Sequence, residues 1–159
     1  ASSGRTPYCL SGLEYAQSLG AKTISLTCAR DNEMSLKSDY PIEVVVGQEV
    51  ITGSTRMKSG SAQKMVLNML TTGTMIKLGK VYGNLMVDVK TSNLKLIERA
   101  RHIIIRATNC SYERATELLE LSNNSVKTAI VMELLNVNYA EAVQKLESNE
   151  GHISLALVK

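Results

Sequence analysis

Apolar residues follow two different spacings within residues 1–80. Pro7 begins a stretch with helical spacing, and Gly20 stands where a glycine commonly follows the end of a helix. Two runs rich in β-branched residues, 22–28 and 42–46, predict strands, and the polar segment between them predicts a loop with one helical turn. The nearly continuous apolar character of 42–46 favours a strand buried in a parallel sheet.

A loop rich in glycine and hydroxyl side chains follows the second strand and leads into a long helix. The loop covers residues 52–61, and we expect the helix to continue to about Leu78. Helix, strand, loop, strand, loop and helix in this order are typical of half of a doubly wound domain. We therefore predict an α/β fold in which residues 1–80 form the second half of a doubly wound parallel-sheet domain and residues 81–90 form a connection.

The remainder of the chain has helical spacing throughout. Three helices are predicted over 92–107, 111–121 and 125–135. A fourth begins at Asn138, and Glu141 is the partner that a capping box requires at that spacing. These short capped helices predict a small all-α helical bundle over residues 91–159.

Composition and charge narrow the range of partners. The chain has 159 residues, of which 44% are hydrophobic, and this is typical of a globular protein. Its 18 Lys and Arg residues are scattered, and Phe and Trp are absent, so we predict neither a basic stripe nor a stacking platform for nucleic acid. The longest mainly apolar stretch, 65–78, is too short and too polar for a membrane helix. We therefore expect no nucleic acid and no membrane as a partner.

Cysteine and histidine usage bears on the compartment and on metals. Cys9, Cys28 and Cys110 lie far apart and form no Cys-x-x-Cys pair, which favours reduced thiols in a cytoplasmic protein. His102 and His152 do not have the spacing of metal ligands. We therefore expect no metal site and no cofactor.

The start of the chain is unusual for an α/β unit. Residue 1 is Ala, and a polar turn that contains a glycine leads directly into the first predicted helix. Such a turn usually follows a β-strand, and none precedes it here. We therefore expect a strand upstream and interpret the chain as the C-terminal part of something larger.

Two loops carry the residue types of a phosphate-binding site. Each combines free backbone N–H groups at the start of a helix with hydroxyl side chains and a glycine that lets an anion approach the backbone. Each also follows, or should follow, a parallel strand, and open α/β sheets bind ligands at that edge. The candidate residues are Ser3, Gly4, Arg5 and Thr6 in the first loop and Thr52, Gly53, Ser54, Thr55, Arg56 and Lys58 in the second. The alternative is that these hydroxyl residues only cap their helices.

Glu49 lies three residues before the second loop, near the expected end of a strand. A carboxylate there could act as a general acid or base, or accept a hydrogen bond from a sugar hydroxyl. The alternative is a solvated loop carboxylate. No Ser/His/Asp or Cys/His arrangement follows from the spacings, so the residues alone identify no catalytic group.

The two loops and the segments after them resemble known families. Residues 3–8, Ser-Gly-Arg-Thr-Pro-Tyr, are similar to the second phosphate-binding loop of sugar-isomerase (SIS) domains. Residues 48–64 resemble the signature shared by N-acetylmuramic acid 6-phosphate etherases and glucokinase regulatory proteins. Residues 68–73 and 79–89, together with the helical tail, resemble the bacterial etherases. The resemblance covers essentially the whole chain, although Gln48 stands where the family usually has proline.

The resemblance to the etherases implies a lyase that works without a cofactor in the recycling of cell-wall amino sugars. Such enzymes remove the C2 proton of N-acetylmuramic acid 6-phosphate, eliminate D-lactate from C3 and add water, which gives N-acetylglucosamine 6-phosphate. The resemblance places the catalytic glutamates upstream of Ala1, so we expect this chain alone to be inactive. It also implies a homodimer and a sugar phosphate held by residues 3–6, with residues 52–58 shaping the same pocket.

Two other functions are compatible with the same fold. A non-enzymatic regulator that senses a sugar phosphate and binds a sugar kinase would share the signature of residues 48–64, but such regulators are normally longer and carry a second SIS domain. An aldose–ketose isomerase would need a different catalytic set, and the sequence of residues 52–58 argues against it.

Overall fold

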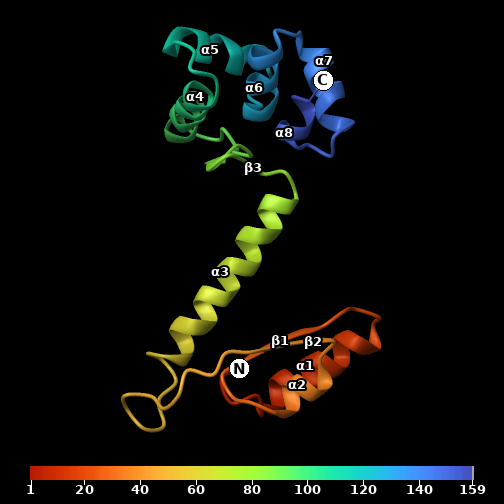
Figure 1. Cartoon of the computed structure of the whole chain (residues 1–159), viewed down its shortest axis with the longest axis vertical. Coiled ribbons are helices and arrows are strands. Elements are labelled where there is room, and N and C mark those ends of the chain that lie inside the picture. Colours follow the sequence, from red (N-terminus) through yellow and green to blue (C-terminus); the bar gives the residue numbers. More distant parts are fainter. Residues whose placement is uncertain (159) are drawn as a thin grey trace. The chain divides into compact units, whose positions relative to one another are not determined.

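The computed structural model describes residues 1–158, and the chain divides into two compact units, Ala1–Thr71 and Thr72–Lys159. No helix formed by residues 1–158 has the length and apolar character needed to cross a membrane. The elements in chain order (Figure 1) are α1 (Pro7–Ser18), β1 (Ile24–Thr27), α2 (Glu33–Lys37), β2 (Tyr40–Glu43), α3 (Ser59–Lys77), β3 (Val81–Tyr82), β4 (Leu85–Met86), α4 (Leu94–Thr108), α5 (Tyr112–Leu121), α6 (Val126–Leu135), α7 (Tyr139–Glu147) and α8 (Ile153–Ala156).

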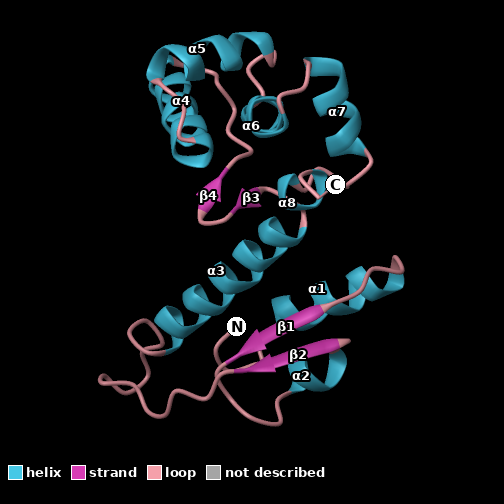
Figure 2. Cartoon of the chain, turned by 45° about the horizontal axis from the view of Figure 1, so that its top comes forward, coloured by secondary structure: helices cyan, strands magenta, loops and turns pink. Residues whose placement is uncertain are grey.

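The first unit is built on a parallel pair of strands, β1 and β2, with α1 and α2 beside them (Figure 2). Ile24 lies opposite Tyr40 in this pair, and the register continues from there along both strands. The carboxylate of Asp39 fixes the start of the pair, because it accepts hydrogen bonds from the Thr23 N–H at 2.9 Å and the Thr23 hydroxyl at 2.8 Å. The hydrogen bond from the Lys22 ammonium group, together with these two bonds from Thr23, holds the pKa of Asp39 well below its ordinary value.

The second strand differs from its sequence prediction in position and in burial. The prediction was residues 42–46, whereas β2 begins and ends earlier in the chain. Residues 44–46 are not a strand, because β1 ends at Thr27, whose carbonyl accepts the last ladder bond from the Val44 N–H at 2.9 Å. The predicted burial of 42–46 is not seen in this chain: Val45 is 51% exposed and none of the five residues is buried, and β2 has a single neighbour in a sheet of two strands.

Polar side chains, more than apolar ones, fill the interior of the first unit. Within Ala1–Thr71, all of which the structure describes, Met34 is the one apolar side chain that is buried. The buried polar residues are Thr23, Ser25, Thr27, Asn32 and Ser59. The apolar side chains of α3 are exposed, among them Met65 at 64% and Met69 at 63%.

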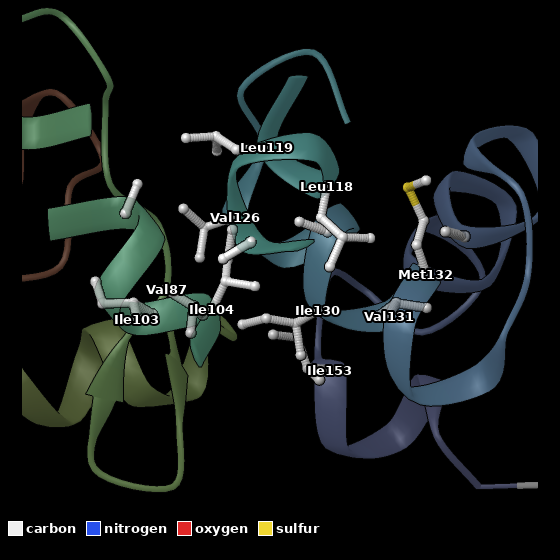
Figure 3. Close-up of a cluster of buried hydrophobic side chains, with 14 of the residues drawn as sticks. Val87, Ile103, Ile104, Leu118, Leu119, Val126, Ile130, Val131, Met132 and Ile153 are labelled. Carbon is white, nitrogen blue, oxygen red and sulfur yellow. The ribbon is translucent and has the colours of Figure 1, made fainter. Parts of the chain in front are cut away.

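The second unit is a helical bundle arranged around α6. This helix contacts α4, α5, α7 and α8, and its buried positions cover most of its circumference, as expected for a central helix. Figure 3 shows Ile104, Leu118 and Ile130, from three different helices, in one apolar cluster. Val87 follows the β3–β4 hairpin and is buried in the same cluster.

The predicted starts of the bundle helices are confirmed. An Asn or Ser side chain at each start accepts a hydrogen bond from a backbone N–H of the first turn, and these caps are Asn93, Ser111, Ser125 and Asn138. The predicted capping box is present, because Glu141 N–H donates to Asn138 Oδ1 at 3.0 Å and Asn138 N–H donates to Glu141 Oε2 at 3.1 Å.

The end of α3 packs closely against the segment between α7 and α8. The Nε2 atom of His152 lies 3.1 Å from the carbonyl oxygen of Lys77, one of the carbonyls that a helix end leaves without an intrahelical partner. A Cβ atom on Gly79 would lie 2.9 Å from the carbonyl oxygen of Gly151. The two backbones therefore approach each other at a distance that only glycine permits at position 79.

The bundle core predicts different effects for two leucines of α5. Leu118 is 0% exposed and Leu121 is 52% exposed. We expect Leu118→Ala to lower the free energy of unfolding of the bundle by about 2–5 kcal/mol, because it leaves a cavity in a packed core. Leu121→Ala should change it by about 0.5 kcal/mol or less. Urea unfolding followed by circular dichroism measures both, and equal effects would contradict this description of the core.

Candidate functional site

The first candidate loop lies at the C-terminal end of β1. The Cys28 N–H donates to the carbonyl of Ser2 at 2.8 Å, and the Met34 N–H at the start of α2 donates to the carbonyl of Gly4 at 3.0 Å. The loop of residues 3–6 is therefore held between β1 and α2, at the edge of a parallel sheet where ligands commonly bind. Within it Gly4 is buried, whereas Ser3, Arg5 and Thr6 are exposed and can meet a ligand.

Asn32 is the buried residue that fixes the position of this loop. Asn32 is 3% exposed, and its side chain lies beside Thr27 at the end of β1. Its Oδ1 atom accepts a hydrogen bond from the Ser35 N–H at 3.0 Å and so caps α2. Its amide nitrogen reaches Thr27 Oγ1 at 2.9 Å and Glu43 Oε1 at 3.1 Å. A Cβ atom at Gly4, where φ is 66°, would lie 2.0 Å from Asn32 Oδ1. The amide therefore joins β1, β2 and α2 and leaves room for glycine alone in the loop.

The N-terminus of α1 carries no side-chain cap. Thr6 occupies the N-cap position with an extended backbone and makes no capping hydrogen bond through its side chain. Pro7 begins the helix, and its first turn contains no acidic residue. Pro7 has no N–H, and the Cys9 N–H donates to the carbonyl of Thr6 at 3.0 Å. The Tyr8 N–H and the positive end of the helix dipole are therefore what this helix end offers to an anion, and Arg5 adds a cation next to them.

The N-terminus of α3, after the second candidate loop, is occupied by a carboxylate. Glu49 Oε1 accepts a hydrogen bond from Ser59 N–H at 3.0 Å, and Glu49 Oε2 accepts one from Lys58 N–H at 3.1 Å. These backbone bonds, with that of Ser59 the strongest, lower the pKa of the Glu49 carboxyl because they favour its charged form. Glu49 thus closes the second loop onto α3 and takes the place that an external anion would occupy at this helix end.

The other residues of the second loop border two shallow cavities on the surface. A cavity of about 460 Å³ is lined by Ile51, Gly53, Ser54, Thr55 and Arg56. A neighbouring one of about 280 Å³ is lined by Gln48, Glu49, Thr52, Gly53 and Ser54. Lys58 lines neither cavity, and its backbone N–H binds Glu49. The hydroxyl side chains and Arg56 therefore face open space that a polar ligand can enter.

Cys28 contacts one residue next to each of the two loops. Besides its bond to Ser2, its Sγ atom lies 3.8 Å from the carbonyl of Ser59, the first residue of α3. Nearby, Gln63 Nε2 donates to the carbonyl of Leu26 at 3.4 Å. The structure thus brings the first loop and the start of α3 to the same end of β1, as expected for one binding site, while the roles of the individual residues stay predictions.

Sequence reasoning missed both Asn32 and Cys28. Asn32 stands before Glu33-Met34 at the start of the predicted helical turn, and an N-cap signal could have found it. Its contact with Gly4 depends on the tertiary structure, as does the position of Cys28 between Ser2 and Ser59. No local signal in the sequence marks these two contacts.

Two parts of the chain are similar to known protein families. Residues 1–73 match the SIS domain family, and residues 83–126 match the C-terminal lid domain of glucokinase regulatory protein. The α/β unit with its two loops is therefore similar to a SIS domain, and part of the helical unit is similar to that lid domain. Both matches agree with the resemblances found in the sequence.

The particular relatives are named N-acetylmuramic acid 6-phosphate etherases. Over 157 residues, which is 99% of this chain, the identity is 57% to the protein of Clostridioides difficile and 53% to that of Bacillus cereus. The protein of Clostridium beijerinckii is 54% identical over the same length. The chain covers 52% or 53% of these relatives, so it spans about half their length. The resemblance to this family is confirmed.

The contact between Gly4 and Asn32 leads to a prediction on stability. We expect Gly4→Ala to destabilise the first unit through both its positive φ and the clash with the Asn32 side chain. Gly47→Ala is the matched control, because Gly47 has a φ of 73° but open space around it, so strain of about 1–2 kcal/mol is expected there. Urea unfolding should show a clearly larger loss for Gly4→Ala. Equal losses would mean that Asn32 moves aside freely.

The Glu49 clasp leads to a prediction on pH. Because the pKa of Glu49 is lower in the folded chain than in an unfolded one, its ionised form stabilises the closed loop above the ordinary glutamate pKa of about 4.3. That stabilisation is lost as the pH falls through the lower folded value. An NMR titration should show the Lys58 and Ser59 amides responding with a midpoint below about 4.3. In Glu49→Gln this response should be absent, and a midpoint at or above the ordinary value would refute the clasp.

Proposed function

We propose that this chain is part of a carbon–oxygen lyase that cleaves the D-lactyl ether of N-acetylmuramic acid 6-phosphate. The products are N-acetylglucosamine 6-phosphate and D-lactate, and the reaction serves the recycling of cell-wall amino sugars. The observation that carries the proposal is an identity of 52–57% over 99% of the chain to proteins named as this etherase. The match of residues 1–73 to the SIS domain supports a sugar phosphate as the ligand.

The phosphate group binds at the N-terminus of α1. Ser3, Gly4, Arg5 and Thr6 surround this helix end, which has neither a side-chain cap nor an acidic residue in its first turn. The N-terminus of α3 is less suitable for a dianion, because the Glu49 carboxylate already accepts its free N–H groups. An uncapped helix end beside an arginine thus supports the first loop as the phosphate site.

The second loop contributes to the same pocket through its side chains. Thr52, Ser54 and Thr55 supply hydroxyl groups, Arg56 supplies a guanidinium group, and Gly53 allows close approach of the backbone to the ligand. Lys58 adds a second cation at the start of α3. The Glu49 oxygens retain lone pairs that can accept a hydrogen bond from a sugar hydroxyl while they hold the loop closed.

The residues that transfer protons are not assigned to this chain. The reaction needs a base that removes the C2 proton and an acid that protonates the leaving lactate, and water then adds to the unsaturated sugar. Glu49 is poorly suited to donate a proton near neutral pH, because its lowered pKa keeps it ionised. We therefore propose that the chain supplies the binding loops, that glutamates outside it supply the acid and base, and that the chain alone is inactive.

The same proposal extends to architecture and assembly. Residues 1–80 form a doubly wound sheet together with further strands from outside this chain. Residues 81–90 connect this domain to the helical bundle, which residues 91–159 form. The exposed apolar side chains of the first unit support this, since Ile24 in β1 is 56% exposed and Leu67 in α3 is 53% exposed. We propose that additional strands cover the sheet, that a second copy covers part of α3 in a homodimer, and that the protein acts in the cytoplasm without a cofactor.

A second candidate function is a non-enzymatic regulator that senses a sugar phosphate and binds a sugar kinase. The observation that favours it is the match of residues 83–126 to the C-terminal lid domain of glucokinase regulatory protein. The regulator and the etherase would bind the phosphate group with the same loop, but only the etherase would convert its ligand into products.

Release of D-lactate from N-acetylmuramic acid 6-phosphate tests the proposal. The chain should be assayed alone and when extended to the full length of its relatives. We expect release by the extended protein only. In that protein Ser3→Ala should raise KM by about tenfold or abolish turnover, because a hydrogen bond to a charged group is lost. Ser11→Ala is the matched control, because Ser11 is an exposed residue of α1 outside both loops.

Each other outcome of this assay is informative. Without release, stabilisation of the extended protein by sugar phosphates in a thermal melt would favour the regulator. Release by the chain alone would refute our assignment of acid and base to residues outside it. Unchanged kinetics of Ser3→Ala would remove Ser3 from the phosphate site.

A further inference from the structure

A cationic pocket lies in the helical unit, outside both candidate loops. It has a volume of about 200 Å³ and is formed between α4 and the β3–β4 hairpin. Leu85 and Ile103 give it an apolar floor, and Asn84 stands at the turn of the hairpin. The remaining lining includes three basic side chains of α4: Arg99, His102 and Arg106.

The spacing of the three basic residues places them on one face of α4. Residues three, four and seven positions apart lie on the same side of an α-helix, and His102 stands between the two arginines. The Cα atoms of Arg99 and Arg106 are separated by two helical turns, or about 10.5 Å along the axis. Their long side chains can therefore reach a ligand above His102 from both sides.

The positive charge of the two pocket arginines is not balanced by acidic side chains. Within residues 1–158 neither Arg99 nor Arg106 takes part in an ion pair, whereas the other arginines of this unit, Arg101 and Arg114, both do. The acid closest to them in the helix is Glu98, and it already has partners.

Glu98 has three partners, Arg101, Tyr112 and the pocket residue His102. Glu98 Oε2 accepts hydrogen bonds from Arg101 Nη1 and from the Tyr112 hydroxyl, each at 3.0 Å. Its other oxygen, Oε1, lies 3.4 Å from His102 Nε2. In the hairpin segment, Asp88 is paired with Lys80. Arg99 and Arg106 therefore leave a net positive rim around the pocket.

We propose that this pocket binds the phosphate group of a small molecule. Two guanidinium groups without acidic partners that line one small pocket suit a tetrahedral oxyanion, whose several oxygens can accept from both of them. The volume is below the usual range of about 300–1,000 Å³ for a complete ligand site, so the pocket takes the phosphate group and leaves the rest of the molecule outside. This inference does not rest on the proposed etherase activity.

Binding of inorganic phosphate to the chain, followed by NMR of the backbone amides and the arginine Nε–H groups, tests the inference. At constant ionic strength, phosphate should shift the signals of Asn84, Met86, Arg99 and Arg106 to saturation, and chloride should not. Arg99→Gln with Arg106→Gln should weaken binding at these signals by about tenfold or more, because two charge-assisted contacts are lost. Both arginines are exposed, so the double variant is expected to fold, and circular dichroism checks this.

Lys145→Gln is the matched control, since it removes a cation of the same unit outside the pocket and should leave the affinity unchanged. Glucose 6-phosphate distinguishes the source of the phosphate group. Tighter binding of glucose 6-phosphate than of inorganic phosphate indicates that the ligand is a phosphate monoester, and equal binding indicates that the pocket recognises the phosphate group alone. Both results support the site. Pocket signals that respond equally to phosphate and chloride, or an unchanged affinity in the double variant, would overturn it. The NMR signals used here belong to the pocket in the helical unit. Phosphate binding at residues 3–6, or a failure of the proposed etherase activity, therefore does not change the conclusion about this pocket.

Discussion

The buried amide of Asn32 joins the elements on which the first unit depends. A side-chain amide offers both a donor and an acceptor, and here the acceptor caps α2 while the donor reaches β1 and β2. Buried polar groups stabilise a fold when their bonds are all made and destabilise it when one partner is lost. In a unit with Met34 as its one buried apolar side chain, this network has the role that an apolar core has elsewhere. Gly4 lies against the amide, so the position of the candidate phosphate loop follows from it.

The two helices that begin at this site differ in electrostatics. The N-terminus of α3 is neutralised by Glu49, whereas the N-terminus of α1 has no side-chain cap and is followed by no acid in its first turn. The chain has thus supplied its own anion at one helix end and kept the other free. That asymmetry is the basis of our proposal that the first loop binds the phosphate group and the second loop shapes the space around the polar groups of the same ligand.

The helical unit is stabilised in a different way. Its helices begin at local caps and bury one apolar cluster around α6, so its stability comes from packing that is complete within residues 72–158. On its exposed surface Arg99 and Arg106 have no ion-pair partner among residues 1–158, whereas Arg101 and Arg114 are paired. The first unit, in contrast, leaves apolar side chains such as Tyr40 and Met65 open to further contacts.

Local signals in the sequence were sufficient to predict most of the elements and the resemblance to the etherases. The caps at Ser111 and Asn138 and the helix that begins at Pro7 depend on contacts within a few residues, which a sequence pattern contains. The end of β2 was not predictable, because it depends on where β1 stops offering carbonyl groups. Likewise, Glu49 was recognised as a candidate, but only the folded loop made it the cap of α3, and only the folded chain placed Asn32 against Gly4. The sequence by itself determined what is local, and the tertiary structure decided which distant polar groups meet, because a hydrogen bond needs its two partners at a set distance and angle.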